Sequence, residues 1–216
     1  MAKTPAQRIK KHGSKAVVPQ HSLPPVINPT TARSPQKAQS NSRLIVIAGV
    51  VASLFLFWYL HLLVLDQMTQ LSVGMAMPDS LVGGFDSGYI GELRTVMNDD
   101  ARGQLNYVHK TAGTLFPLLF SFTWLLLIGT NVARKSLRWA LWAVPMLFVV
   151  ARLWGNVTID SVLAAETADA GQVALASGLT IAGWVLFVLS LLTGAAAVFL
   201  GRKPGSKNTN SPSTTP

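Results

Sequence analysis

Four long apolar segments without a single acidic residue alternate with polar stretches along this chain of 216 residues. A helix needs about 20 apolar residues to cross the hydrocarbon core of a bilayer. The four segments reach that length, and they lie at residues 44–65, 111–131, 137–156 and 175–200. The pattern predicts an all-α protein whose membrane domain, residues 44–200, is a bundle of four transmembrane helices.

The two ends of the chain have the composition of disordered protein. Residues 1–43 mix Pro, Ser, Lys and Gln, and residues 201–216 are similarly polar. Such segments contain too few large apolar side chains to offset the conformational entropy that ordering would remove. We therefore expect both tails to be disordered.

The loop between the first and second spans, residues 66–110, contains a helical pattern. Gly and Pro residues indicate irregular backbone in its first part. In its second part Ile90 and Leu93 recur at helical spacing, and Asn98 or Asp99 is suited to cap a helix that leads into the second span. We expect one or two short helices here, lying at the membrane interface.

Composition narrows the classes of function. The chain is 50% hydrophobic and 12% charged, and the charged share is about half that of a soluble domain. The absence of cysteine excludes disulfides, thiolate metal sites and cysteine nucleophiles. A net charge of +9 is more typical here of basic flanks beside anionic lipid than of nucleic-acid binding. We expect the bilayer as partner, with anionic lipid at the basic N-terminal tail, and no nucleic acid.

The distribution of charge orients the predicted helices. Fourteen of the eighteen basic residues lie in the two tails or in and beside the turn between the second and third spans, and all nine acids lie in the other two loops. Because basic residues collect on the cytoplasmic side, both termini are predicted to be cytoplasmic. Loops 66–110 and 157–174 are then external, and the cell (inner) membrane is the predicted location.

The first apolar segment is predicted to be a signal anchor. Its 22 apolar residues and the 43 residues before it are both too long for a cleaved signal peptide. An organellar transit peptide is the alternative, because residues 1–65 contain no acid. The Lys, Pro and Gln residues of the tail fit an Arg-rich amphipathic helix poorly.

Arg152 is the candidate for a functional polar residue. It lies about 22 Å from the start of the third span, where charge is costly and often functional. One interpretation pairs it inside the bundle with Asp160, Asp66 or a carboxylate of the long loop. The other needs no function: the helix continues to about Asp160, and Arg152 extends its charged end to the headgroups.

His61 and His109 are the candidates for cofactor binding. His61 ends a four-residue row with Gly49, Ser53 and Phe57, which predicts that it faces the bundle, and His109 lies on the same side of the membrane. Two histidines on facing helices are able to hold a haem. The other two histidines fall in the N-terminal tail, and no flanking pattern indicates a porphyrin, so neither a cofactor nor a metal site is predicted.

Small residues four apart predict close helix packing. In the fourth span the row is Ala174, Gly178 and Ala182. Such rows let membrane helices approach closely, either within the bundle or against a membrane-protein partner or a second copy in a homo-oligomer. No pattern indicates catalysis: Asp99 and Asp100 are adjacent, so on a helix their carboxylates point about 100° apart.

Several residues between positions 88 and 156 resemble a group of uncharacterised small four-span bacterial integral membrane proteins. The shared positions are Gly88, Tyr89, Gly103, Tyr107, Phe116, Pro117, Pro145 and Asn156. Arg152 and Gly155 stand where that group has acids, which puts a shared polar site in doubt. The resemblance implies a bacterial inner membrane and supplies no activity.

The function expected from these observations is non-enzymatic. Only one charge lies well inside a predicted span, and no interrupted span of the transporter kind is present. We expect a small subunit or an assembly and interaction factor. The alternative is a redox (haem-binding) or transport module with a polar site at the outer mouth of the bundle.

Overall fold

The computed structural model of the protein describes residues 35–167 and 169–201. The chain divides into residues 1–41 and a compact unit of residues 42–216, and the bundle belongs to the second unit. Most of the two tails predicted to be disordered lies outside the described residues. One helix begins at Pro35, inside the predicted N-terminal tail, and the last helix continues to Gly201. Pro is favoured at a helix start, where its missing N–H would have no acceptor.

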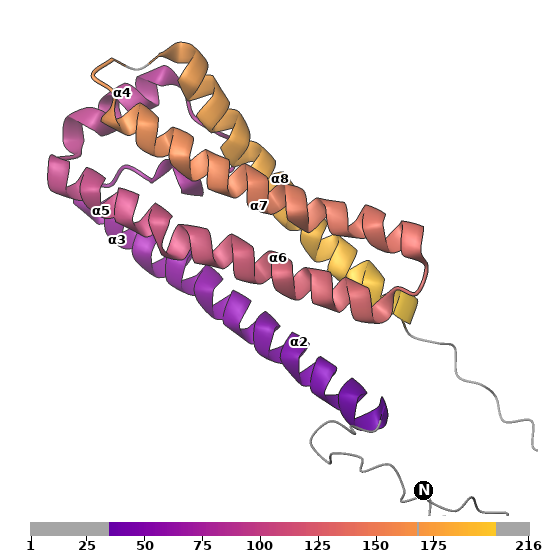
Figure 1. Ribbon diagram of the computed structural model, residues 1–216. Helices are drawn as coiled ribbons and strands as arrows, with labels where there is room; N and C mark the ends of the chain where they lie inside the picture. Colours follow the sequence, from indigo (N-terminus) through magenta and orange to yellow (C-terminus); the bar gives the residue numbers. More distant parts are fainter. Residues whose placement is uncertain (1–34, 168, 202–216) are drawn as a thin grey trace, which may run out of the picture. The chain divides into compact units, whose positions relative to one another are not determined.

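Every regular element of the described part is helical (Figure 1). The elements are α2 (Pro35–Trp58), the π-helix η2 (Tyr59–Val64), α3 (Leu65–Leu71), the 3-10 helix η3 (Pro78–Ser80), α4 (Ser87–Val96), α5 (Asp99–Lys110), α6 (Ala112–Asn131), α7 (Lys135–Ala164) and α8 (Ala170–Gly201). Four helical stretches are long and apolar enough to cross a membrane: Asn41–Leu71, Asp99–Asn131, Lys135–Ala164 and Ala170–Gly201. The predicted all-α bundle of four spans is confirmed, and the chain is a multi-pass membrane protein.

The third span is longer than hydropathy predicts. The prediction ends it at Asn156, whereas α7 continues to Ala164. The additional turns keep an apolar face, because Ile159 and Val162 are buried, and contacts inside the protein stabilise the helix after the apolar run has ended. Arg152 is consequently about three turns from the end of the helix.

The first span faces the bundle through the predicted row that ends at His61. Ser53 is buried, and a Cβ on Gly49 would lie 2.9 Å from Cγ2 of Thr123 in α6. At Tyr59–Val64 the helix changes to π-helical hydrogen bonding. Short π segments inside α-helices are frequent at functional sites, and His61 lies in this one.

The last span packs within the bundle through small residues, but not through the predicted row. Ala174 and Gly178 are exposed, because residues spaced strictly by four drift around a helix of 3.6 residues per turn. The buried face instead alternates steps of three and four and carries Ala176, Thr180, Gly183, Ser190, Gly194 and Ala197. Gly194 admits the indole of Trp124, whose Nε1–H donates to the carbonyl of Ser190 at 2.6 Å.

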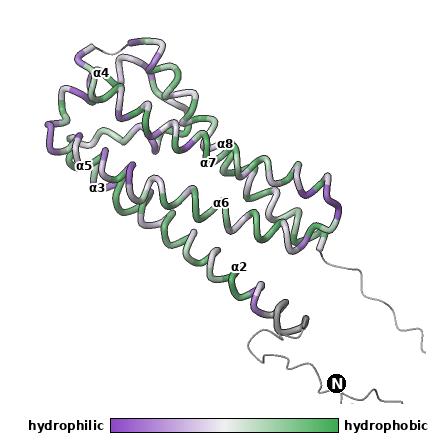
Figure 2. The backbone as a smooth tube through the Cα atoms, in the orientation of Figure 1, coloured by the Kyte–Doolittle hydropathy of each residue, from purple (hydrophilic) through white to green (hydrophobic). Residues whose placement is uncertain are grey.

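Residues 72–98, which we call the cap, cover one end of the bundle and contain η3 and α4 (Figure 1). The helical pattern predicted around Ile90 is confirmed as α4, and the predicted cap of α5 is also confirmed: Oδ1 of Asn98 accepts from the backbone N of Ala101 at 2.8 Å. The fully buried apolar residues of the cap are Met77, Ile90, Leu93 and Met97. Figure 2 shows hydrophilic residues near the ends of the helices and hydrophobic residues between them.

Candidate functional site

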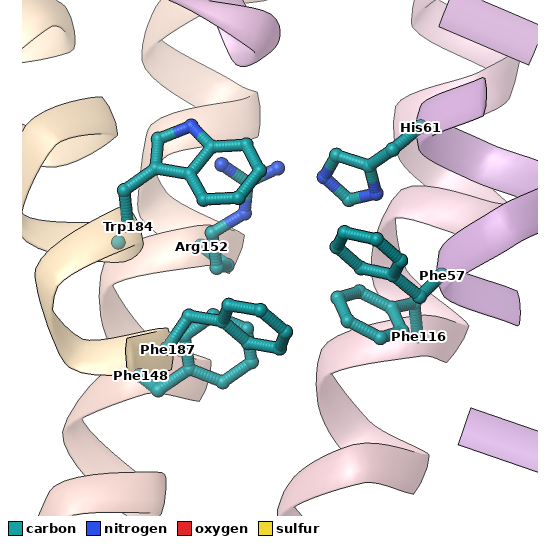
Figure 3. A pocket seen from close by; sticks show the side chains of 8 residues that line it. Phe57, His61, Phe116, Phe148, Arg152, Trp184 and Phe187 are labelled. Atoms are coloured by element: carbon teal, nitrogen blue, oxygen red, sulfur yellow. The ribbon is translucent and has the colours of Figure 1, made fainter. Parts of the chain in front are cut away.

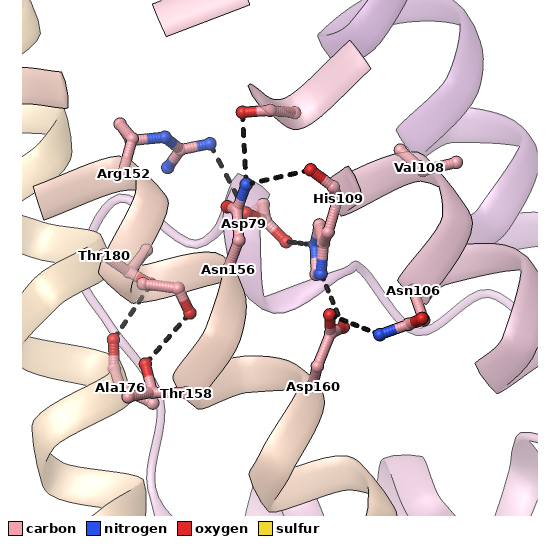
Figure 4. A network of polar contacts seen from close by, with 12 residues as sticks. Asp79, Asn106, Val108, His109, Arg152, Asn156, Thr158, Asp160, Ala176 and Thr180 are labelled. Atoms are coloured by element: carbon pink, nitrogen blue, oxygen red, sulfur yellow. Dashed lines mark hydrogen bonds and ion pairs between the residues drawn. The ribbon is translucent and has the colours of Figure 1, made fainter. Parts of the chain in front are cut away.

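Six polar side chains from three elements meet beneath the cap, and we call them the polar network (Figure 4). They are Asp79 of η3, Asn106 and His109 of α5, and Arg152, Asn156 and Asp160 of α7. The three residues of α7 are four apart, and the two of α5 are three apart, so each set lies on one face of its helix. The folding of the cap adds the carboxylate of Asp79 from above these two faces.

The ring of His109 lies between two carboxylates. Its Nδ1 is 2.6 Å from Oδ1 of Asp160, and its Nε2 is 2.9 Å from Oδ2 of Asp79. The side chains of His109 and Asp79 are each 3% exposed. A neutral imidazole has one N–H, so when both carboxylates are ionised the ring donates from both nitrogens and is positively charged.

Arg152 binds the other oxygen of the carboxylate in the cap. Its Nη2 donates to Oδ1 of Asp79 at 3.3 Å, and Arg152 is 6% exposed. The side chain therefore lies buried and paired, and does not extend to the surface. The partner of Arg152 is thus a carboxylate of the long loop, which was one of the predicted alternatives. Asp160, another predicted partner, binds His109 instead. Gly183 makes room for the aliphatic part of the Arg152 side chain, because a Cβ there would lie 2.8 Å from Cδ of Arg152.

Two amides complete the hydrogen bonding. Nδ2 of Asn106 donates to Oδ2 of Asp160 at 2.7 Å. At Thr111 the backbone leaves helical geometry, with φ −107° and ψ −93°, and separates α5 from α6. Nδ2 of Asn156 donates at 3.1 Å to the carbonyl of Gly113 at this junction. The network thus connects the α5–α6 junction to α7 and the cap to both α5 and α7.

The charges of the network balance. Two carboxylates face one guanidinium and, in its doubly protonated form, one imidazolium. Burial by itself would raise the pKa of Asp79, but the nearby ring of His109 and the guanidinium of Arg152 outweigh it, and the pKa lies below its ordinary value. Asp79 is therefore ionised at neutral pH, and the cap is held by charge-assisted hydrogen bonds, which are about twice as strong as neutral ones.

On its other side, Arg152 lines a small cavity, which we call the aromatic cavity (Figure 3). Its volume is about 10 Å³, and its other walls are His61, Trp184, Gly183 and the four rings of Phe57, Phe116, Phe148 and Phe187. His61 stacks on Phe57 with ring centroids 4.6 Å apart. Figure 3 shows its imidazole and the guanidinium of Arg152 facing each other. Nδ1 of His61 is buried without a hydrogen-bond partner in the described part of the chain.

The two histidines that sequence analysis singled out lie in different surroundings. Both ring nitrogens of His109 are bound by carboxylates, whereas His61 lies among aromatic rings. A haem held between them would need a free nitrogen on each ring. Within residues 35–167 and 169–201, no group of three or more His, Asp and Glu side chains is arranged to hold a metal ion.

Sequence reasoning missed most of the polar network. Asp79 was not distinguished from the other acids of the loop, and Asp160 was considered only as a partner of Arg152. A signal was present: Arg152, Asn156 and Asp160 are spaced by four residues, which places three polar side chains on one face of a membrane helix. Nothing in the spacing indicated that the cap would return to that face.

Comparison with known proteins gives no match to any family model, curated protein or solved structure. What is established is a multi-pass, all-α membrane protein with a buried network of ion pairs and hydrogen bonds beneath its cap.

Proposed function

We propose that this protein is non-enzymatic and acts through contacts, as a small subunit or an assembly factor in the membrane, with the cap as its contact surface. One observation carries the proposal: Asp79 of the cap is bound at once by His109 and by Arg152. A buried, charged connection of this kind holds a loop in a single conformation. A surface that is ordered before a partner arrives loses less entropy on binding.

The chemistry of the network favours a structural role over catalysis. A general base needs a nitrogen or oxygen that is free to take a proton from a substrate. Both nitrogens of His109 and both oxygens of Asp79 are already engaged within the protein. The network therefore supports a contact protein better than it supports an enzyme.

The proposed orientation places the cap outside the cell (inner) membrane, with both termini in the cytoplasm. The positive-inside rule supports it, because Arg134 and Lys135 are exposed at the turn between α6 and α7, at the other end of the bundle (Figure 1). The cap and the start of α5 expose Asp86, Glu92, Asp99 and Asp100, which suits a partner with basic groups. The basic N-terminal tail would contact anionic lipid of the inner leaflet.

Site-directed photocrosslinking of the full chain in membranes tests this proposal. A photoreactive residue at Glu92, exposed on the cap, should yield a defined adduct, and the substitution Asp79→Asn should remove the adduct while leaving membrane insertion intact. The matched control is Leu192, 59% exposed on α8, which should contact lipid alone. A chain that stays monomeric and partnerless in mild detergent, or equal adducts from Glu92 and Leu192, would contradict the proposal.

A second candidate is a redox or transport module with a polar site at the outer mouth of the bundle, and the burial of Arg152 favours it. The visible spectrum of the purified protein tests the haem-binding version of this candidate, because a protein without a Soret band contains no haem. For transport, Arg152→Leu should abolish flux. Unchanged flux would remove that form.

A further inference from the structure

A second, larger cavity adjoins the aromatic cavity, and we call it the lipid-side cavity. It has a volume of about 240 Å³ and lies between α2, α6 and α8. The two cavities share the rings of Phe57, Phe116 and Phe187 as walls. An apolar cavity of about 150 Å³ is already large enough to bind benzene. The lipid-side cavity therefore has room for a six-membered ring.

The lining of the lipid-side cavity suits a flat ring that enters from the bilayer. Leu54 of α2 and Leu191 of α8 line it and are 64% and 40% exposed on the outside of the bundle, so the cavity reaches the lipid-facing surface. Phe120 and Trp124 add aromatic faces, on which rings stack favourably. Because protein interiors are closely packed, a hydrocarbon occupant is expected in a space of this size.

Two buried polar atoms along these cavities have no partner in the described part of the chain. They are Oγ of Ser53, in a residue 2% exposed that lines the lipid-side cavity, and Nδ1 of His61 beside the aromatic cavity. Most buried polar groups in proteins are hydrogen-bonded, so each exception calls for an explanation. His61 also lies in the π segment of the first span, a feature that recurs at functional sites.

The charges of the polar network, which balance when His109 is protonated, favour a ligand whose polar end is uncharged. Arg152 already shares its charge with Asp79, so an additional anion would unbalance the buried charges. A neutral oxygen acceptor adds no charge and accepts hydrogen bonds from N–H groups of His61 and Arg152. The aromatic cavity, about 10 Å³, has room for about one oxygen atom.

We propose that the two cavities form a binding site for a quinone-type molecule of the membrane, a flat ring with carbonyl oxygens and a hydrocarbon tail. The ring lies in the lipid-side cavity against Phe57, Phe116 and Phe187, which pack together as the wall between the cavities. These rings rotate on binding, and one carbonyl oxygen then reaches the aromatic cavity between His61 and Arg152. The tail leaves past Leu54 and Leu191 into the bilayer. This inference does not depend on the cap being a contact surface.

The test is equilibrium binding of benzoquinone with a decyl tail to the full chain in detergent or nanodiscs. Because Trp124 and Trp184 line the two cavities, binding should quench their fluorescence saturably. Decylbenzene, which lacks the carbonyls, and decanoate, which replaces them with an anionic head, are the comparison ligands. Both should bind at least about tenfold more weakly, the equivalent of one good hydrogen bond.

Variants locate the site. His61→Leu should weaken quinone binding at least about tenfold without changing decylbenzene binding, and His61→Asn, which keeps a donor, should retain part of the affinity. Ser53→Phe, which fills the lipid-side cavity, should remove binding of both ligands. The control is Phe55→Leu on the lipid-facing side of the same helix, where Phe55 is 58% exposed.

Three results would overturn the inference: no saturable quenching, equal affinity for decylbenzene and the quinone, or tighter binding of decanoate. The elution volume and unfolding midpoint of each variant are compared with the wild type first. If Ser53→Phe does not fold, Leu54→Trp at the lipid-facing rim serves the same purpose. Quinone binding is measured without any partner of the cap. A failure of the crosslinking test therefore leaves this inference standing, and a failure of the quinone test leaves the proposed function standing.

Discussion

Replacing Asp79 by Asn should destabilise the protein by more than most single substitutions. Asp79→Asn keeps the shape of the side chain, but it removes the negative charge that His109 and Arg152 share. It also places an amide N–H₂ group against either the guanidinium of Arg152, which can only donate, or the ring of His109, which accepts only after it loses a proton. Because the side chain of Asp79 is only 3% exposed, water cannot replace the lost contacts. Removing one partner of a buried ion pair costs about 3–5 kcal/mol.

The assay is thermal unfolding in a mild detergent, followed by tryptophan fluorescence. Trp184 reports on this region because its Nε1–H donates to the backbone carbonyl of Asp79 at 3.0 Å. For a protein of this size a loss of 1 kcal/mol lowers the unfolding midpoint by about 2–4 °C, so the expected decrease is roughly 10 °C. Asp66→Asn is the matched control, because Asp66 is exposed; it should change the midpoint by no more than about 2 °C.

A double-mutant cycle shows whether the mechanism is the unpaired charge. Arg152→Leu removes the guanidinium that Asp79→Asn leaves without its carboxylate, so the double variant should regain part of the midpoint lost by Asp79→Asn alone. Strict additivity of the two losses would refute an ion-pair mechanism. A decrease below about 2 °C for Asp79→Asn would refute the view that the cap is held by charge.

The remaining predictions concern pH, packing and topology. Because the pKa of Asp79 is lower in the folded protein than its ordinary 3.8, its stabilisation is complete above that value and is lost as the pH falls below it. The difference in midpoint between wild type and Asp79→Asn should therefore stay constant from about pH 8 to pH 5 and shrink below about pH 4. Gly194→Ala should lower the free energy of unfolding by about 1–3 kcal/mol, because the new methyl group displaces the indole of Trp124. Gly178→Ala, with open space around it, should leave the free energy of unfolding unchanged or raise it slightly. Denaturation in detergent measures both. In this chain without cysteine, Ser87→Cys on the cap should react with an impermeant maleimide in intact cells and Ser136→Cys only after permeabilisation; the reverse pattern would invert the topology.

The four spans follow from sequence because the bilayer imposes a length and a composition on any helix that crosses it. The third span shows the limit of that rule. Hydropathy ends it at Asn156, yet α7 continues to Ala164 because its last turns pack inside the protein. The N-cap at Asn98 and the helix around Ile90 were also predictable, since capping and helical spacing depend on a few neighbouring residues.

The packing face of α8 and the pairing within the polar network depend on contacts between distant residues. Steps of four along α8 suggested one face, and the buried face instead alternates three and four. Likewise, the row from Arg152 to Asp160 lies on one side of α7 by spacing alone, but its partners come from elsewhere. Asp79 precedes Arg152 by 73 positions, and no local pattern marks it among the nine acids.

The sequence by itself determined that this chain is an all-α, multi-pass membrane protein, because those properties follow from local hydropathy and periodicity. It left open whether Arg152 extends to the headgroups or lies paired inside the bundle. The tertiary structure decided this, since the return of the cap over α5 and α7 brings the carboxylate of Asp79 to both His109 and Arg152. Burial of a charge is set by what surrounds it in space, and only the packing of distant segments supplies those neighbours.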